Sequence, residues 1–226
     1  MTNIKIKKAL HLCVSLVIII LTIIIAFTCS TNTASAAEKQ TDVLINEIQY
    51  RIEESLKTDD KYLVNGMPLA MSSNPYDYIK DNDEYDKLIA LGTESIDELY
   101  KLQQDSEKYD SFQRYIIAIA IEDITKTDLK QSSDYFWEDA DSFSENWDEF
   151  ASDAEENVLQ ILDDDSLTQN EKIENICFYG SLAEDALTQI DTRQMSAQEI
   201  SVIDSAKEEI SSASRDELVE FAQANE

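Results

Sequence analysis

The chain has 226 residues and carries 47 acidic against 18 basic side chains, which gives a formal net charge of −29. A surface this acidic repels nucleic acids and anionic lipids, and it favours basic partners or divalent cations. The chain has only three glycines and two prolines, too few turn-forming residues for a many-stranded fold. Its single histidine, His11, lies in the amino-terminal segment, so the rest of the chain holds no Ser–His–Asp system and no histidine zinc site.

Residues 1–36 have the pattern of a secretory signal peptide. Three lysines precede a long apolar run, and Ala34-Ser35-Ala36 supplies the small residues that signal peptidase requires. Cleavage after Ala36 would release the protein or leave it at the cell surface. Two alternatives stay open: residues 9–27 are nearly long enough to remain as a membrane anchor, and Cys29 is a candidate for lipidation.

The first part of the predicted secreted chain reads as helix, loop and helix. Apolar residues keep helical spacing over residues 38–57, and residues 58–73 form a predicted loop that contains Gly66 and Pro68. Asn74-Pro75 predicts a helix start, because asparagine caps free amides and proline has no donor to leave unpaired. This helix is predicted to end at Gly92.

Two further helices are predicted before residue 126. Thr93 restarts the helical pattern, and residues 105–110 form a polar turn. Residues 112–125 are rich in isoleucine and have strand propensity, but their apolar positions keep helical spacing and no turn signal interrupts them. We therefore predict a buried helix here.

This segment, residues 74–125, resembles a HEAT-type helical repeat. The residues that carry the resemblance are Leu88 to Gly92, Ile96, Leu99, Asp110, Arg114, Ala118, Ala120 and Ile124. In that family, an aspartate in the turn bonds the backbone or the arginine of the second helix, which implies a structural role for Asp110 and Arg114. Gln113 and Glu122 depart from the pattern, and no second copy follows. The wider segment is also similar to parts of uncharacterised exported proteins of Gram-positive bacteria.

The second half of the chain predicts a helical bundle. Four Ser/Thr-x-x-Glu capping boxes mark helix starts, at Ser142/Glu145, Thr168/Glu171, Ser196/Glu199 and Ser214/Glu217. Each is followed by a one-sided apolar stripe, which a helix buries against other helices. Gly180 lies on such a stripe, where it would permit close helix approach.

The predicted fold is therefore all-α, with a HEAT-like helical hairpin segment followed by a helical bundle. The predicted organisation comprises the signal peptide, an amino-terminal helical segment over residues 37–126, a linker over residues 127–143 and a carboxy-terminal bundle over residues 144–226. The linker holds Tyr135, Phe136 and Trp137, which either dock the two halves together or form an exposed patch for a partner.

Candidate chemistry is confined to carboxylates. Asp163, Asp164 and Asp165 form the sharpest cluster, at a predicted helix end where the helix dipole disfavours negative charge, so Ca²⁺ is a possible ligand. The alternative is a solvated acidic loop. A carboxylate-dependent hydrolase is conceivable, but nothing marks two acids as a pair. Cys177, at helical spacing, reads as a core residue.

The tyrosine-rich segment supplies the candidate binding residues, Tyr76, Tyr78 and Tyr85, to which Trp137 is added. We expect a secreted or cell-surface, non-enzymatic protein that binds a protein or peptide, with a basic partner favoured by charge. The alternative functions are a divalent-cation-binding or structural envelope protein and, third, a hydrolase. No cofactor other than Ca²⁺ is expected, and membrane contact would come only through the amino-terminal segment.

Overall fold

The structure, a computed structural model, describes residues 39–57, 63–64 and 66–222. The predicted signal peptide, with the alternative anchor and Cys29, lies outside the described residues. The chain divides into two compact units, residues 1–42 and residues 43–226. Of the first unit, only residues 39–42 are described, and they are helical.

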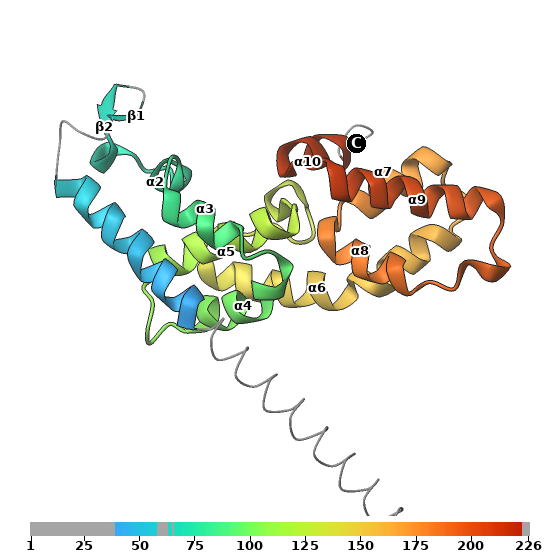
Figure 1. Cartoon of the computed structure of the whole chain (residues 1–226), viewed down its shortest axis with the longest axis horizontal. Helices are drawn as coiled ribbons and strands as arrows, with labels where there is room; N and C mark the ends of the chain where they lie inside the picture. Colours follow the sequence, from blue (N-terminus) through green and yellow to red (C-terminus); the bar gives the residue numbers. More distant parts are fainter. Residues whose placement is uncertain (1–38, 58–62, 65, 223–226) are drawn as a thin grey trace, which may run out of the picture. The chain divides into compact units, whose positions relative to one another are not determined.

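The second unit confirms the all-α prediction, because helices make up most of its described residues (Figure 1). Its amino-terminal part begins with the helix that ends at residue 57, called here the first helix. The following elements are β1 (Leu63–Val64), β2 (Met67–Pro68), η1 (Leu69–Met71), α2 (Tyr76–Ile79), α3 (Asp83–Ile89), η2 (Thr93–Ser95), α4 (Ile96–Gln104) and α5 (Ser111–Thr125). In the two-stranded antiparallel sheet, Leu63 pairs with Pro68 and Val64 with Met67.

The carboxy-terminal part of this unit is also helical (Figure 1). Its elements are η3 (Leu129–Gln131), α6 (Ala140–Asp163), α7 (Gln169–Cys177), α8 (Gly180–Gln189), η4 (Thr192–Gln194), α9 (Ala197–Ser212) and α10 (Arg215–Ala222). None of the helices among the described residues is long and apolar enough to span a membrane.

Helix α5 is the centre of the unit. It packs against α3, α4, α6 and α8. Its residues from Ile116 to Ile121 are almost completely removed from solvent. An isoleucine-rich helix buried on all sides is stabilised by tertiary packing more than by intrinsic propensity, which explains why the strand-like composition still gives a helix.

One hydrophobic core extends through the described part of this unit, from Leu44 in the first helix to Leu218 in α10. Trp137, Phe143, Trp147 and Phe150 form an aromatic chain within it, with successive ring centroids 5.1 to 5.9 Å apart. Such offset and edge-on contacts are the favoured geometry for aromatic pairs. The residues leading into α6 therefore contribute to the core rather than only crossing the surface.

The helix predicted from Asn74 to Gly92 is wrong as a single element. Asp81 adopts a left-handed conformation with φ of +57°, and Asn82 then caps α3 by accepting hydrogen bonds from the amides of Glu84 and Tyr85. An asparagine side chain that caps a new helix competes with continuation of the old one. The chain thus forms a short α2, a turn and α3.

The capping boxes predicted at Thr168, Ser196 and Ser214 are confirmed, since each hydroxyl accepts a hydrogen bond from the amide of the glutamate three residues later. The box predicted at Ser142 is wrong. Asp139 caps α6 and Ser142 is the third residue of that helix, so the helix begins three residues earlier than predicted.

The predicted continuous helix after Thr168 is also wrong, because α7 and α8 meet in a break at Gly180. This glycine has a φ of +52°, and a Cβ added to it would lie 2.0 Å from the backbone oxygen of Thr125. The predicted close approach at Gly180 is thus confirmed, with the backbone of the α5 end as the neighbour.

Candidate functional site

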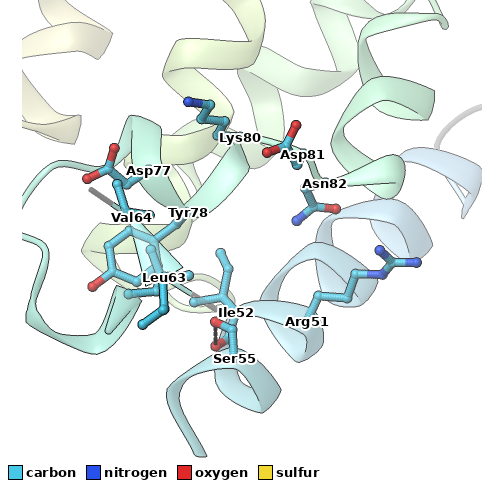
Figure 2. Close-up of a pocket in the computed structure, with 11 residues that line it drawn as sticks. Arg51, Ile52, Ser55, Leu63, Val64, Asp77, Tyr78, Lys80, Asp81 and Asn82 are labelled. Carbon is cyan, nitrogen blue, oxygen red and sulfur yellow. Dashed lines mark hydrogen bonds between the residues drawn. The ribbon is translucent and has the colours of Figure 1, made fainter. Parts of the chain in front are cut away.

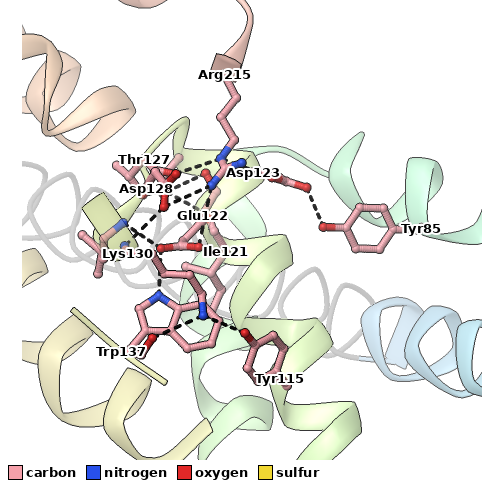
Figure 3. A network of polar contacts seen from close by, with 12 residues as sticks. Tyr85, Tyr115, Ile121, Glu122, Asp123, Thr127, Asp128, Lys130, Trp137 and Arg215 are labelled. Carbon is pink, nitrogen blue, oxygen red and sulfur yellow. Dashed lines mark hydrogen bonds and ion pairs between the residues drawn. The ribbon is translucent and has the colours of Figure 1, made fainter. Parts of the chain in front are cut away.

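A buried polar network lies at the carboxy-terminal end of α5 (Figure 3). At its centre, Glu122 has no exposed surface. Its Oε1 accepts hydrogen bonds from the Leu129 amide at 2.8 Å and from Trp137 Nε1 at 2.9 Å. The carboxylate therefore fastens the η3 turn and the following segment to α5.

Arg215, the first residue of α10, closes this network from the other side. Its Nε donates to the Thr127 carbonyl oxygen at 2.8 Å and lies 3.3 Å from Asp123 Oδ1. Its Nη2 lies 3.8 Å from Glu122 Oε2 and 3.9 Å from Asp128 Oδ1. One guanidinium is thus shared among three carboxylates.

Two atoms of the network are left without a hydrogen bond in the described part of the chain, Glu122 Oε2 and Arg215 Nη2. Burial disfavours the charged carboxylate and raises the pKa of Glu122 to about 7, although its two hydrogen bonds and Arg215 act in the opposite direction. Burial likewise raises the pKa of Asp123, whose Oδ2 accepts a hydrogen bond of 2.6 Å from the Tyr85 hydroxyl.

Two lysines extend the network. Lys130 Nζ lies 3.7 Å from the centre of the Trp137 ring and donates to the Tyr115 hydroxyl at 2.6 Å. Lys126 Nζ donates to the carbonyl oxygens of Ile210 and Ala213, both at 2.7 Å, at the end of α9. A cation at this position satisfies carbonyls that the last helical turn leaves unpaired.

The contacts of this network hold α5, η3 and α10 together. A carboxyl with a pKa near 7 suits general acid or base catalysis, but a substrate must approach within hydrogen-bond distance of it. Glu122 has no exposed surface in this structure. Its contacts instead hold the segment that follows α5, through Leu129 and Trp137, and join it to the distant α10 through Arg215.

A second feature is an open pocket of about 350 Å³, called here the hairpin pocket (Figure 2). It is lined by Arg51, Ile52, Ser55, Leu63, Val64, Leu69, Asp77, Tyr78, Lys80, Asp81 and Asn82. Figure 2 shows the first helix, with Arg51 and Ser55, on one side and the Asp81–Asn82 turn on the other. This size and mixed lining suit a peptide side chain or a small ligand.

Several side chains of the hairpin pocket are fixed before any ligand arrives. Arg51 Nη2 lies 3.2 Å from Glu84 Oε1, and the Tyr78 hydroxyl donates to the Ser72 carbonyl oxygen at 2.8 Å. By contrast, the side chain of Leu63 in the lining is 56% exposed. Exposed apolar side chains beside a concave surface are typical of a contact site for a partner.

The four predicted binding residues do not share one surface. Tyr78 lines the hairpin pocket, whereas Tyr76 is half-buried against the core. Tyr85 is buried with its hydroxyl on Asp123, and Trp137 is fully buried against Glu122 and Lys130. Of the four, Tyr78 is therefore the one placed to meet a ligand.

The predicted structural pair, Asp110 and Arg114, has two separate roles. Asp110 caps α5 and forms a capping box with Gln113, whose Oε1 accepts a hydrogen bond from the Asp110 amide. The Arg114 guanidinium instead donates to the Gln103 carbonyl oxygen at 2.5 Å and pairs with Asp141 at 2.7 Å. Gln113, which departs from the HEAT pattern, is thus the capping partner.

Of the three acids predicted as a possible metal site, two line one pocket and the third does not. Asp163 and Asp165 line a pocket of about 440 Å³. The Asp164 carboxylate accepts hydrogen bonds from the amide and the hydroxyl of Ser166. At the end of α6, the Lys172 ammonium donates to the Leu162 carbonyl oxygen. Among the described residues, no group of three or more His, Cys, Asp or Glu is arranged to hold a metal ion.

Cys177 lies in the core, where burial raises the pKa of its thiol to about 12. The thiolate, which is the nucleophilic form, is therefore scarce at neutral pH. The predicted reading of Cys177 as a core residue is confirmed.

Sequence reasoning missed the roles of Glu122, Asp123 and Arg215. Glu122 was noted only as a departure from the repeat pattern, and Arg215 lies 93 positions later in the chain. The one available signal was an acidic pair at the end of an otherwise apolar helix, because charged side chains are rarely buried without a partner. The partner itself had no local signal.

In comparisons with protein family models, with curated proteins and with solved structures, the chain has no significant match.

Proposed function

We propose that this chain is a non-catalytic binding protein of the cell envelope, and that the hairpin pocket receives a protein or peptide segment. The single observation that supports this most is an open pocket whose lining includes the largely exposed side chain of Leu63. An apolar side chain exposed within a concave surface offers a contact to a bound segment.

The chemistry of the partner follows from charge. With a net charge of −29, the chain attracts basic segments at a distance and repels acidic ones. Within the hairpin pocket, Asp77 and Asp81 are matched in number by Lys80 and by Arg51, which is paired with Glu84, so the preference for a basic segment rests on the charge of the whole chain. The proposed partner is therefore an extended basic segment that places one apolar side chain against Leu63.

Site-specific photo-crosslinking tests this proposal. A photoreactive phenylalanine analogue replaces Leu63 in one variant and Leu159, an exposed leucine of α6, in a matched control. Each is irradiated with a lysine-rich and with a glutamate-rich random peptide library. We expect labelling of the Leu63 variant by the lysine-rich library alone. Equal labelling at both positions, or by both libraries, would contradict the proposal.

The other functions remain predictions. For a divalent-cation-binding or structural envelope protein, a calcium titration that shifts the melting temperature, and is cancelled by D163N/D165N, would give support. A carboxylate-dependent hydrolase would require a route to a carboxyl such as Glu122, which is fully buried. We also propose that the protein is secreted or at the cell surface, and that residues 74–125 form a HEAT-like segment. Fractionation of cells into medium, membrane and wall tests the proposed location.

A further inference from the structure

A separate pocket, called here the tyrosine pocket, lies among α6, α7 and the segment before α6. Its volume is about 540 Å³, within the range of small-molecule sites. No residue lines both this pocket and the hairpin pocket. The inference below therefore goes beyond the proposed function and does not rest on it.

Aromatic rings form one part of the lining. Tyr135 and Phe178 are half-buried and Tyr179 is buried, and all three line the pocket. They are held by contacts with Phe150, whose ring centroid lies 5.1 to 5.6 Å from theirs. The rings are thus fixed by the core while part of their surface faces the pocket, which is the preorganisation that a binding site needs.

Carboxylates form the second part. Asp134, Glu171 and Glu174 line the pocket, and among the described residues that line it none is Lys, Arg or His. The capping box of α7 positions Glu171, whose Oε2 accepts a hydrogen bond of 2.7 Å from the Thr168 amide. Burial is the main cause that raises the pKa of Tyr135, and the charges of Glu149, Asp153 and Asp134 raise it further. These charges indicate a negative potential at the Tyr135 ring.

The combination of aromatic faces with carboxylates, in a lining that has no basic side chain among the described residues, selects the ligand class. Aromatic rings attract organic cations through their quadrupole, and carboxylates form strong charge-assisted hydrogen bonds with ammonium groups. A bare metal ion fits poorly, because these acids are not among any group arranged to hold one in the described part of the chain. Ile161 and Leu167, also in the lining, provide contact for an aliphatic stem.

We propose that the tyrosine pocket binds an alkylammonium ion, with Tyr135 and Phe178 against the cation and its stem, and with Asp134 and Glu171 accepting its N–H groups. This chemistry is offered by a free polyamine and by a lysine side chain of another protein. The overall negative charge of the chain raises the local concentration of either one.

The test is calorimetric titration of the protein with 1,5-diaminopentane and with N-acetyl-lysine methylamide, at about 0.15 M salt to screen diffuse attraction. The uncharged isostere 1,5-pentanediol is the ligand control. We expect the diamine to bind at least about tenfold tighter than the diol, because only the amine is charged. Binding of both amines identifies the side chain of a protein as a possible source, and binding of the diamine alone identifies a free polyamine. Equal binding of diamine and diol would overturn the proposal.

Matched variants locate the site. D134N/E171Q removes two charges from the tyrosine pocket, and the glutamine still accepts the hydrogen bond that caps α7. D163N/D165N removes two charges from the separate pocket of about 440 Å³ that these two acids line. We expect the first to weaken diamine binding at least fivefold and the second by less than twofold. Y135L is expected to weaken binding while Y135F retains it, because only the ring is needed. Equal effects of the two charge variants, or weak binding by Y135F with an unchanged melting temperature, would overturn the proposal.

Discussion

The indole Nε1 of Trp137 donates a hydrogen bond of 2.9 Å to Glu122 Oε1, and neither side chain has any exposed surface. The same oxygen accepts from the Leu129 amide, so one carboxylate organises the turn that follows α5. Arg215 lies 3.8 Å from the second oxygen, too far for a direct hydrogen bond. The balance between burial and these contacts sets the charge of Glu122.

The first prediction concerns the pH dependence of stability. Burial raises the pKa of Glu122 from its ordinary 4.5 to about 7. Between these values the unfolded chain has released the proton and the folded chain still holds it, so the free energy of unfolding falls as pH rises through this window. Relative to E122Q, which cannot titrate there, the wild-type protein should lose about 3 kcal/mol between pH 4.5 and 7 and no more above it.

Denaturant unfolding of both proteins at several pH values measures this difference. Fluorescence gives a second measurement, because Trp137 is bonded to the titrating group and W147F removes the other tryptophan. In W147F we expect an emission change with a midpoint near pH 7 that disappears in W147F/E122Q. A difference between wild type and E122Q that is constant from pH 4.5 to 7 would show that Glu122 does not titrate in this range.

Removal of the arginine that faces these acids is the second prediction. R215M leaves Glu122 and Asp123 buried without their shared cation, which should lower the free energy of unfolding by about 3 kcal/mol. Because Arg215 begins α10, amide hydrogen exchange in α10 should accelerate as well. R193M is the matched control: the Arg193 side chain is exposed and, within the described part of the chain, pairs with Asp191, so no measurable change is expected. Comparable losses in the two variants would contradict a buried role for Arg215.

The parts of the fold that could be predicted from sequence are those set by neighbouring residues. The boxes at Thr168, Ser196 and Ser214 need two side chains three positions apart, and all three cap helices. The break at Asp81 accompanies the local cap that Asn82 forms on α3, which was not predicted. The break at Gly180 was missed because its positive φ accompanies close contact with a distant segment. At Gly180 that segment is the Thr125 backbone, 55 positions earlier.

The candidate sites show the same division. Tyr78 was predicted as a binding residue from local tyrosine density, and it lines the hairpin pocket. Trp137 was named as an aromatic residue of the predicted linker, yet it is fully buried, because aromatic side chains are used both in cores and in binding surfaces. The pairing of Glu122 with Arg215 depends on the docking of α10, which no local pattern encodes.

The third prediction compares two glycines. At Gly180 an added Cβ would meet the Thr125 carbonyl oxygen at 2.0 Å, whereas at Gly66, which also has a positive φ, it would meet no atom of the described residues within 4 Å. G66A should therefore cost only backbone strain, about 1–2 kcal/mol. G180A adds a clash with backbone and should cost about 2–4 kcal/mol more. Thermal unfolding of both variants decides this, and equal losses would mean that the α7–α8 break can move away from α5.

The last prediction separates Asp110 from Arg114. The Arg114 guanidinium lies 2.7 Å from Asp141, while the Asp110 carboxylate accepts the Gln113 amide at 2.8 Å. D110A should cost about 1 kcal/mol through loss of the helix cap, and its effect should add to that of R114M within about 0.5 kcal/mol.

A double-mutant cycle of R114M with D141N should instead show a coupling of about 0.5–1 kcal/mol, since this ion pair has one buried partner. Both cycles use the same arginine variant, so the loss of its bond to the Gln103 carbonyl oxygen cancels between them. The measurement is denaturant unfolding of the six proteins at neutral pH. A larger coupling to Asp110 than to Asp141 would restore the aspartate–arginine pair that the HEAT-like pattern implies, and would require a different arrangement of the α4–α5 turn.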